Sequence, residues 1–145
     1  MTERLFRTMT DADRTGVAEV GYSSWLANRH YQEWFNPVVE DRARNWLADW
    51  VKNPKCDVVV CVADFAVIGW GARDNYEQAG CGRELDYISD LWVSPAAQGL
   101  GVGTALLGEL CDRMRAEGST RARIEVAQAN LRAIDLYVRQ GFRET

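Results

Sequence analysis

A run of closely spaced glycines constrains the fold of this chain more than any other stretch. It reads Gln98-Gly99-Leu100-Gly101-Val102-Gly103-Thr104 and lies between a β-rich segment and a segment with helical periodicity. Glycine at alternate positions lets the backbone turn sharply, so that several amide N–H groups point toward one place. The helix that follows adds the positive end of its dipole. A strand, such a turn and a helix in this order predict an α/β domain with a phosphate-binding loop.

Two common nucleotide-binding patterns differ from this loop. A P-loop needs the pattern G-x-x-x-x-G-K-[ST], and the loop contains no lysine. A dinucleotide fingerprint needs G-x-G-x-x-G, whereas Thr104 stands where the third glycine should be, and no glycine-rich turn follows the first predicted strand. A nucleotide-binding domain that has drifted from the P-loop pattern is kept as an alternative.

The loop resembles the Q/R-x-x-G-x-G/A motif of the GCN5-related N-acetyltransferase (GNAT) superfamily. The preceding Leu91-Trp92-Val93-Ser94-Pro95 is similar to the strand ending in V-x-P that leads into this motif. A second segment is similar to the family pattern N-x-x-A-I-x-L-Y-x-x-x-G-F, with Asn130, Ala133-Ile134, Leu136-Tyr137 and Gly141-Phe142. The resemblance covers residues 85–142 in detail, and the first half of the chain agrees in the order of its elements.

The resemblance implies that acetyl-CoA is the cosubstrate and that no metal is needed. Amides of residues 98–104 then hold the pyrophosphate, and the pantetheine arm lies between two parallel strands that splay apart. The implied coenzyme-binding residues are Leu91, Trp92, Val93, Gln98, Gly99, Leu100, Gly101, Val102, Gly103, Thr104, Asn130, Ala133 and Tyr137.

The resemblance also implies the catalytic residues Tyr137 and Glu125. Tyr137 is the expected general acid toward the departing thiolate, and the Val93 amide is an expected oxyanion donor. Glu125 stands twelve positions before Tyr137, a spacing similar to that of RimI-type enzymes. In a strand Ile124 and Val126 point the other way, and burial raises the pKa of a carboxyl toward that of a useful base. A surface carboxylate is the alternative reading, and Asp90, Glu84 and Asp86 are alternative bases.

Hydrophobic patterning predicts one domain, residues 1–145, with elements in the order β-α-α-β-β-β-α-β-α. The resemblance implies a GNAT-type α/β (α+β) fold: a mixed, mostly antiparallel sheet with a splayed central parallel strand pair flanked by helices. Gly69 and Gly71 inside a strand indicate a bulge or a close neighbour. The predicted strands are 5–8, 57–63, 66–72, 85–93 and 123–127, and the predicted helices are 10–26, 39–51, 101–116 and 130–140.

The acceptor is expected to be a primary amine, either of a small molecule or of a protein N-terminus. Segments 25–39 and 73–83 are the expected acceptor-binding parts. Aromatic residues that could wall a pocket are Trp34, Phe35, Trp70 and Tyr76, and acidic residues that suit a cationic amine are Glu33, Glu77 and Glu84. The default interpretation is a structural role for most of these aromatic residues and solvated surface charge for the acidic residues.

Composition excludes several other functions. The net charge of −4 disfavours nucleic-acid partners, and no apolar run approaches the ~20 residues that span a bilayer. Four scattered cysteines and a single histidine, His30, fit neither a zinc site nor a disulfide framework. Reduced thiols in the cytoplasm are the simplest interpretation, and Cys81 as a nucleophile has no supporting motif.

Family members continue past the Gly-Phe pair with two further strands, and here Arg143-Glu144-Thr145 follow. The C-terminal strands are thus apparently missing, and an edge of the sheet is expected to be bare. Strand pairing or strand exchange in a homodimer, or a truncated sequence, would account for this. A non-catalytic acyl-CoA-binding sensor or regulatory module is therefore the second functional hypothesis.

Overall fold

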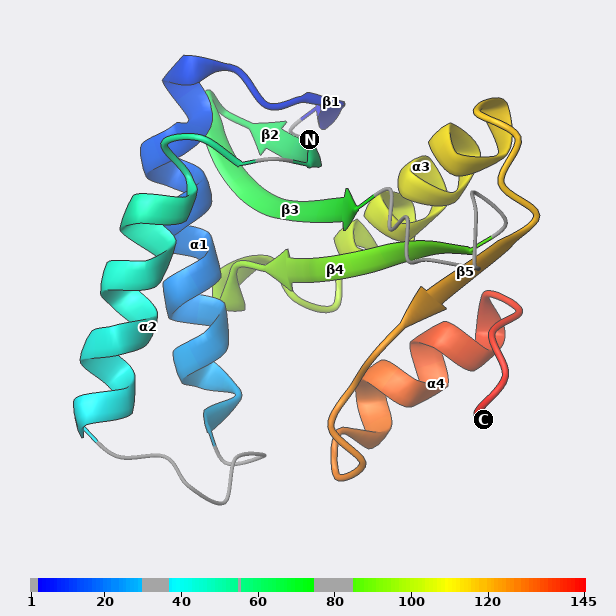
Figure 1. The fold of residues 1–145 in the computed structure, drawn as a ribbon. Coiled ribbons are helices and arrows are strands. Elements are labelled where there is room, and N and C mark those ends of the chain that lie inside the picture. The colour runs from blue at the N-terminus through cyan, green and yellow to red at the C-terminus, as the bar shows by residue number, and fades with distance from the viewer. Residues whose placement is uncertain (1–2, 30–36, 55, 75–84) are drawn as a thin grey trace.

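The computed structural model describes residues 3–29, 37–54, 56–74 and 85–145. Within these residues one sheet has the strand order β1-β2-β3-β4-β5 (Figure 1). Neighbouring strands are antiparallel except for β4 and β5, which are parallel. The strands are β1 (Leu5–Thr8), β2 (Asp57–Ala63), β3 (Ala66–Asp74), β4 (Leu85–Val93) and β5 (Arg121–Ile124).

Helices cover both faces of this sheet. Strand alternation in β2 shows the division, because Val58 and Val60 pack in the cluster that contains α1 and α2 residues, whereas Val59 and Cys61 pack under α3. Side chains of α4 join the α3 side. The helices are α1 (Arg14–Ala27), α2 (Pro37–Trp50), α3 (Val102–Ala116) and α4 (Leu131–Arg139), with short 3-10 turns at η1 (Asp11–Asp13) and η4 (Pro95–Ala97).

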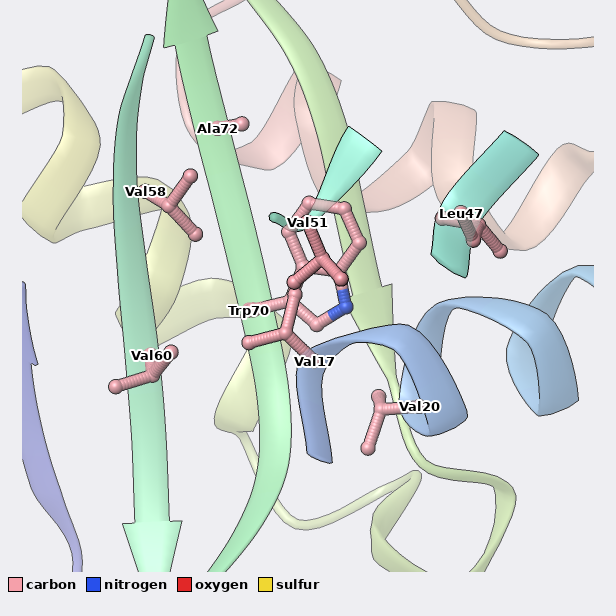
Figure 2. Close-up of a cluster of buried hydrophobic side chains, with 8 residues drawn as sticks. All are labelled: Val17, Val20, Leu47, Val51, Val58, Val60, Trp70 and Ala72. Carbon is pink, nitrogen blue, oxygen red and sulfur yellow. The ribbon is translucent and has the colours of Figure 1, made fainter. Parts of the chain in front are cut away.

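Trp70 is the centre of the core on the α1 and α2 side (Figure 2). Its side chain is fully buried, and its ring stacks on Trp50 at 5.3 Å between ring centroids. Trp50 stacks in turn on the half-exposed Trp46 at 5.7 Å. Three tryptophans thus run from the surface of α2 into the sheet, which gives a small domain a large buried apolar area. Trp70 is therefore a core residue, which confirms the structural interpretation of this aromatic side chain.

Gly69 and Gly71 let α3 approach β3 closely. A Cβ at Gly71 would lie 2.7 Å from Leu110 Cδ1, and one at Gly69 would lie 2.9 Å from Val102 Cγ1. Both distances are shorter than carbon atoms tolerate, so a side chain at either position would push the helix away. The sequence-based expectation of a close neighbour is confirmed.

The two parallel strands separate part-way along their length. Their pairing ends at Ile88 and Ile124, while β4 continues to Val93. On the other edge of β4, the register with β3 shifts between Ala72 and Arg73, whose partners are Asp90 and Ile88. At this point β4 has one more residue than β3, which forms a β-bulge. A bulge bends and twists a strand. The bulge lies where the splay begins, so it directs the end of β4 away from β5 (Figure 1).

The predicted splay and fold class are confirmed, but several boundaries differ. The strand predicted at 123–127 is β5, Arg121–Ile124, because residues 125–127 have no ladder partner once the strands diverge. The first helix begins with a 3-10 turn, and the second begins at Pro37. The last helix is Leu131–Arg139, since Asn130 serves as its N-cap.

An ion pair fixes the start of the first helical segment. The Asp13 carboxylate accepts hydrogen bonds from Arg7 Nη2 at 3.0 Å and from the Thr10 backbone N–H at 2.7 Å. The Arg7 hydrogen bonds lower the pKa of Asp13 to about 2. Because the ionised form is favoured in the folded state, this contribution to stability is present above the ordinary carboxyl pKa and is lost as the pH falls toward 2.

Replacing Asp13 with Asn is therefore expected to lower the free energy of unfolding by about 2 kcal/mol at pH 7. Urea denaturation at a series of pH values should show the difference from wild type shrinking below pH ~4. The matched control is Asp11→Asn. Asp11 lies in the same turn and pairs with Arg14, but its side chain is 93% exposed. A pH-independent difference for Asp13→Asn would contradict the assignment.

Candidate active site

The end of β4, the glycine loop, the segment after β5 and α4 enclose one cleft of about 750 Å³. Residues at the C-terminal end of α1 also line the cleft. The lining residues are Ser24, Ala27, Asn28, 88–93, 97–99, 101–104, 124–127, Asn130, Arg132, Ala133, Leu136, Tyr137 and Arg139. The cleft thus lies where the parallel strands have separated.

The glycine loop presents unsatisfied amides to this cleft. Gly99 and Gly101 have positive φ angles of 79° and 81°, which residues with side chains rarely adopt. The first hydrogen bond of α3 runs from Ala105 N–H to Gly101 O at 3.1 Å, and no side chain caps the helix. The preceding amides of the first turn therefore have no helical acceptor, and the helix dipole adds positive potential. The arrangement suits an anion such as a phosphate.

The end of β4 presents a free backbone edge. Ser94 N–H donates to Ile68 O of β3 at 2.8 Å, so alternation turns the backbone groups of Val93 and Leu91 away from β3 and into the cleft. Since the pairing with β5 has ended at Ile88, no described strand pairs with them. The Val93 carbonyl accepts a hydrogen bond from Ser24 Oγ at 2.7 Å, so the Val93 N–H and the Leu91 groups are the ones left without a partner among the described residues. An extended ligand with amide groups could pair with this edge like a strand.

Tyr137 lines the same cleft from α4. Asn130 starts this helix, because its Oδ1 accepts a hydrogen bond from Ala133 N–H at 3.2 Å. Burial raises the pKa of Tyr137 to about 12, and its ring packs against Phe142 at 6.2 Å between centroids. Among the described residues, the hydroxyl has no hydrogen-bond partner. Tyr137 is therefore a protonated donor at neutral pH whose proton is available to a ligand.

Two candidate bases line the cleft in different surroundings. Glu125 follows β5 and its side chain is 67% exposed, with Arg123 Nη2 at 4.0 Å. The prediction that Glu125 lies within a strand is wrong, because the chain leaves the sheet at Ile124. Its exposure agrees with the interpretation as a surface carboxylate. Asp90 is half-buried and accepts a hydrogen bond from Trp92 Nε1 at 3.1 Å. The other two candidates, Glu84 and the side chain of Asp86, lie outside the described residues.

The cleft brings together the coenzyme-binding and catalytic residues that were named from the sequence, except Leu100. The Leu100 side chain is 57% exposed and does not line the cleft, and its carbonyl accepts a hydrogen bond from Arg4 Nη1 at 2.6 Å. Sequence reasoning missed Ser24 and Arg132, which do line it. Arg132 could have been found, because it lies only two positions after Asn130, which the sequence already indicated. A serine inside a helix gives no sequence signal that it lines a cleft.

Several expected acceptor-site residues lie outside the described part of the chain. These are Glu33, Trp34, Phe35, Tyr76, Glu77 and Glu84, together with most of segment 73–83. His30 and Cys81 also lie outside it. Within the described part, no group of three or more His, Cys, Asp or Glu side chains could hold a metal ion. The helices described there are also too short or too polar to cross a membrane.

The family model "Acetyltransferase (GNAT) family" matches residues 23–142. The chain belongs to the GNAT acetyltransferase family. Among curated proteins, this GNAT chain is 30% identical over 105 residues to an uncharacterized N-acetyltransferase of Methanocaldococcus jannaschii, a match covering 68% of the chain and 45% of that protein. It is 27% identical over 78 residues to the thialysine N-epsilon-acetyltransferase of Sus scrofa, covering 54% of the chain and 45% of that enzyme. The GNAT chain thus spans less than half the length of these relatives.

Solved structures share the GNAT fold along almost the whole chain. The PaiA N-acetyltransferase of Thermoplasma acidophilum, crystallised with coenzyme A, superposes with a TM-score of 0.82 at 17% identity, covering 99% of this chain and 91% of that one. A GNAT family acetyltransferase of Brucella melitensis, crystallised with acetyl-CoA, gives 0.73 at 19% identity, covering 98% and 84%. At these identities the similarity concerns the fold.

Proposed function

We propose that this GNAT chain is an acetyl-CoA-dependent N-acetyltransferase that acts on a primary amine. The observation that carries the proposal is the convergence of three features on one cleft: the free amides of the glycine loop, the free edge of β4 and the Tyr137 hydroxyl. Each suits a different part of the coenzyme, namely the pyrophosphate, the pantetheine amides and the thioester sulfur. The family membership and the coenzyme complexes of its structural neighbours support the same assignment.

The residues of the cleft fit the coenzyme in chemistry and in space. Amides of residues 98–104 suit the pyrophosphate, and a Cβ at Gly101 would meet nothing within 4 Å, so the space before the loop is open. Leu91 and Val93 offer backbone groups to the pantetheine arm. Asn130 Nδ2 adds a donor from the start of α4, since the helix cap uses only its Oδ1.

When bound, acetyl-CoA supplies an activated acetyl group as a thioester. A carboxylate must take the proton of the acceptor amine, directly or through water, because an alkylammonium ion has no free electron pair. We assign this role to Glu125, with Asp90 as the alternative. The Val93 N–H stabilises negative charge on the carbonyl oxygen. A C–N bond forms and the C–S bond breaks as Tyr137 donates a hydrogen bond and then a proton to the sulfur. The second proton that the nitrogen loses returns through water to the Tyr137 oxygen, while the first stays on the carboxylate until solvent takes it.

Isothermal titration with acetyl-CoA, followed by an assay of thiol release, tests this proposal. ATP and NAD are the control ligands, and the acceptor panel contains thialysine, lysine, polyamines and short peptides with free N-termini. We expect saturable binding of acetyl-CoA alone and thiol release that depends on one class of amine. Binding without release for any amine would favour a non-catalytic acyl-CoA-binding module, and no binding by folded protein would overturn both functions.

Arg132 is expected to strengthen coenzyme binding through charge. Its Nη2 lies 3.8 Å from the position that a Cβ on Gly99 would occupy, and it forms no ion pair with the described residues. Arg132→Gln should weaken acetyl-CoA binding about fivefold, because a partly exposed charged contact with a phosphate is lost. The control is Arg115→Gln, since Arg115 pairs with Asp112 on α3 away from the cleft. Equal affinities of the two variants would contradict this role.

We also propose that two copies of the chain associate along β5. This strand ends the sheet, so its outer edge has no strand partner among the described residues. Leu131 and Val138 on the nearby α4 are 72% and 52% exposed. Light scattering after gel filtration should give the mass of a dimer, and Val138→Asp should give that of a monomer, because a charge would be buried. A monomeric wild type at all concentrations would contradict the proposal.

A further inference from the structure

Arg73 is a buried arginine near the end of β3 that joins three elements. Its side chain is 5% exposed, and arginine is seldom buried so deeply unless it is paired. Nε donates to Asp57 Oδ2 at the start of β2 at 2.9 Å. Nη1 and Nη2 donate to the two carboxylate oxygens of Glu117, the C-cap of α3, at 2.9 and 2.6 Å. These bonds fix both the position and the plane of the guanidinium group.

The strand pairing places Arg73 beside the point where the cleft begins. Arg73 pairs with Ile88 of β4, and Ile88 pairs with Ile124 in the last step of the β4–β5 ladder. The bulge of β4 follows at once, because the preceding residue of β3, Ala72, pairs with Asp90. Ile88 and Ile124 both line the cleft. The ion pairs of Arg73 therefore hold the strand position from which β4 and β5 diverge.

The other side chains of β3 on the α3 face contribute little to the register with β4. β3 presents Gly69 and Gly71 to α3, and a glycine has no side chain to contact the neighbouring strand. Strands rich in glycine have a weakly specified register. The Trp70–Trp92 pair lies on the opposite face and before the bulge. Setting the register is the best-attested use of a buried polar group, and Arg73 is placed to do this.

We propose that Arg73 is a positioning residue for the coenzyme cleft, because its ion pairs set the place of the bulge in β4 and thereby the opening between β4 and β5. As far as it concerns acetyl-CoA, this inference rests on the proposed function. Without these ion pairs, no side chain on the α3 face of β3 holds the bulge at one place along β4. Molecules with a displaced bulge would have a differently shaped cleft, so the apparent affinity for the coenzyme would fall with the fraction that keeps the correct one.

Arg73→Met removes the charge and keeps much of the buried volume. The two carboxylates that it leaves are 25% and 47% exposed, and Asp57 keeps its ion pair with Arg113 at 2.9 Å. Replacing a buried ion pair with an apolar side chain is often neutral for stability. Arg113→Met is the matched control, because Arg113 shares the Asp57 carboxylate but lies on α3. Its other bonds go to Glu109 and Thr8, which are outside β3.

Hydrogen exchange of the protein without ligand, followed by mass spectrometry, tests the placing of the bulge. Exchange in residues 85–93 should be at least about tenfold faster in Arg73→Met than in wild type, and unchanged in Arg113→Met. Glu117→Gln weakens the same ion pairs from a half-exposed position and should give a smaller increase in the same segment. If Arg73→Met does not fold, an unchanged exchange rate in Glu117→Gln would overturn the inference.

Calorimetry with acetyl-CoA gives the functional readout. Arg73→Met should bind about tenfold more weakly, as expected when about a tenth of the molecules keep the correct bulge. The thermal unfolding temperatures of Arg73→Met and Arg113→Met should be similar. Unchanged exchange of residues 85–93 in Arg73→Met would overturn the inference, as would equal losses of affinity in the two variants. If folded wild type binds no acetyl-CoA while Arg73→Met still speeds exchange, the proposed function fails and the role of Arg73 in placing the bulge stands.

Discussion

Replacement of Tyr137 by Phe is expected to lower kcat by about 100-fold, the range typical for loss of a positioned acid. The hydroxyl is the one part of the side chain that the change removes, so the apolar contact with Phe142 remains. Coenzyme affinity should change less than about threefold, because the ring still fills the same wall of the cleft. Steady-state kinetics of thiol release and calorimetry measure the two quantities separately.

The pH dependence provides a second readout for the same residue. Burial raises the pKa of Tyr137 to about 12, so the side chain keeps its proton throughout the range in which the protein can be assayed. The rate should therefore rise as the amine loses its proton and should not fall again below pH ~10, the ordinary pKa of tyrosine. A fall near that pH that disappears in Tyr137→Phe would show an unshifted tyrosine.

Tyr22→Phe is the matched control for this substitution. The Tyr22 hydroxyl donates a hydrogen bond to Glu40 Oε1 and accepts one from Arg44 Nη2 at 2.7 Å, so it joins α1 to α2. Tyr22 does not line the cleft. Its removal is expected to leave kcat within about threefold of wild type, as for a residue outside the reacting centre. If Tyr137→Phe behaves like Tyr22→Phe, then Tyr137 is a packing residue and another group protonates the sulfur.

The sequence was sufficient to predict features that depend on the backbone conformation of a few neighbouring residues. The sharp turn of the glycine loop follows from a residue type that few other conformations use, and the positive φ angles of Gly99 and Gly101 confirm it. Gly69 and Gly71 indicated a close neighbour before α3 could be identified as that neighbour. Each of these signals spans a few positions, so a single sequence contains it.

Tertiary geometry decided the features that the sequence did not reveal. Alternation in Ile124-Glu125-Val126 favours a strand, but a strand also needs a partner, and β4 has already diverged at that level. Glu125 is therefore exposed. The place of Ser24 in the cleft lining is similar in this respect, because its hydroxyl bonds to the carbonyl of Val93, 69 positions away. No pattern within α1 distinguishes Ser24 from Ser23.

Replacement of Gly101 by Glu should weaken acetyl-CoA binding by at least about 100-fold, since like charges brought together at a binding site cost several kcal/mol. Gly101 lines the cleft at the N-cap of α3, and an added side chain would extend into open space. A carboxylate there would occupy the position proposed for the pyrophosphate and would offer negative charge to the free amides. Calorimetry with acetyl-CoA measures the loss directly.

Backbone strain must be separated from this blocking effect, because Gly101 has a φ of 81°. Gly118→Glu is the matched control, since Gly118 has a φ of 89°, nothing lies within 4 Å of an added Cβ, and the residue follows α3 away from the cleft. Each substitution should cost about 1–2 kcal/mol of stability, the usual strain of a left-handed conformation. Similar thermal unfolding with loss of binding in Gly101→Glu alone would locate the anion site at the loop. Equal binding by the two variants would remove the basis for placing the coenzyme there.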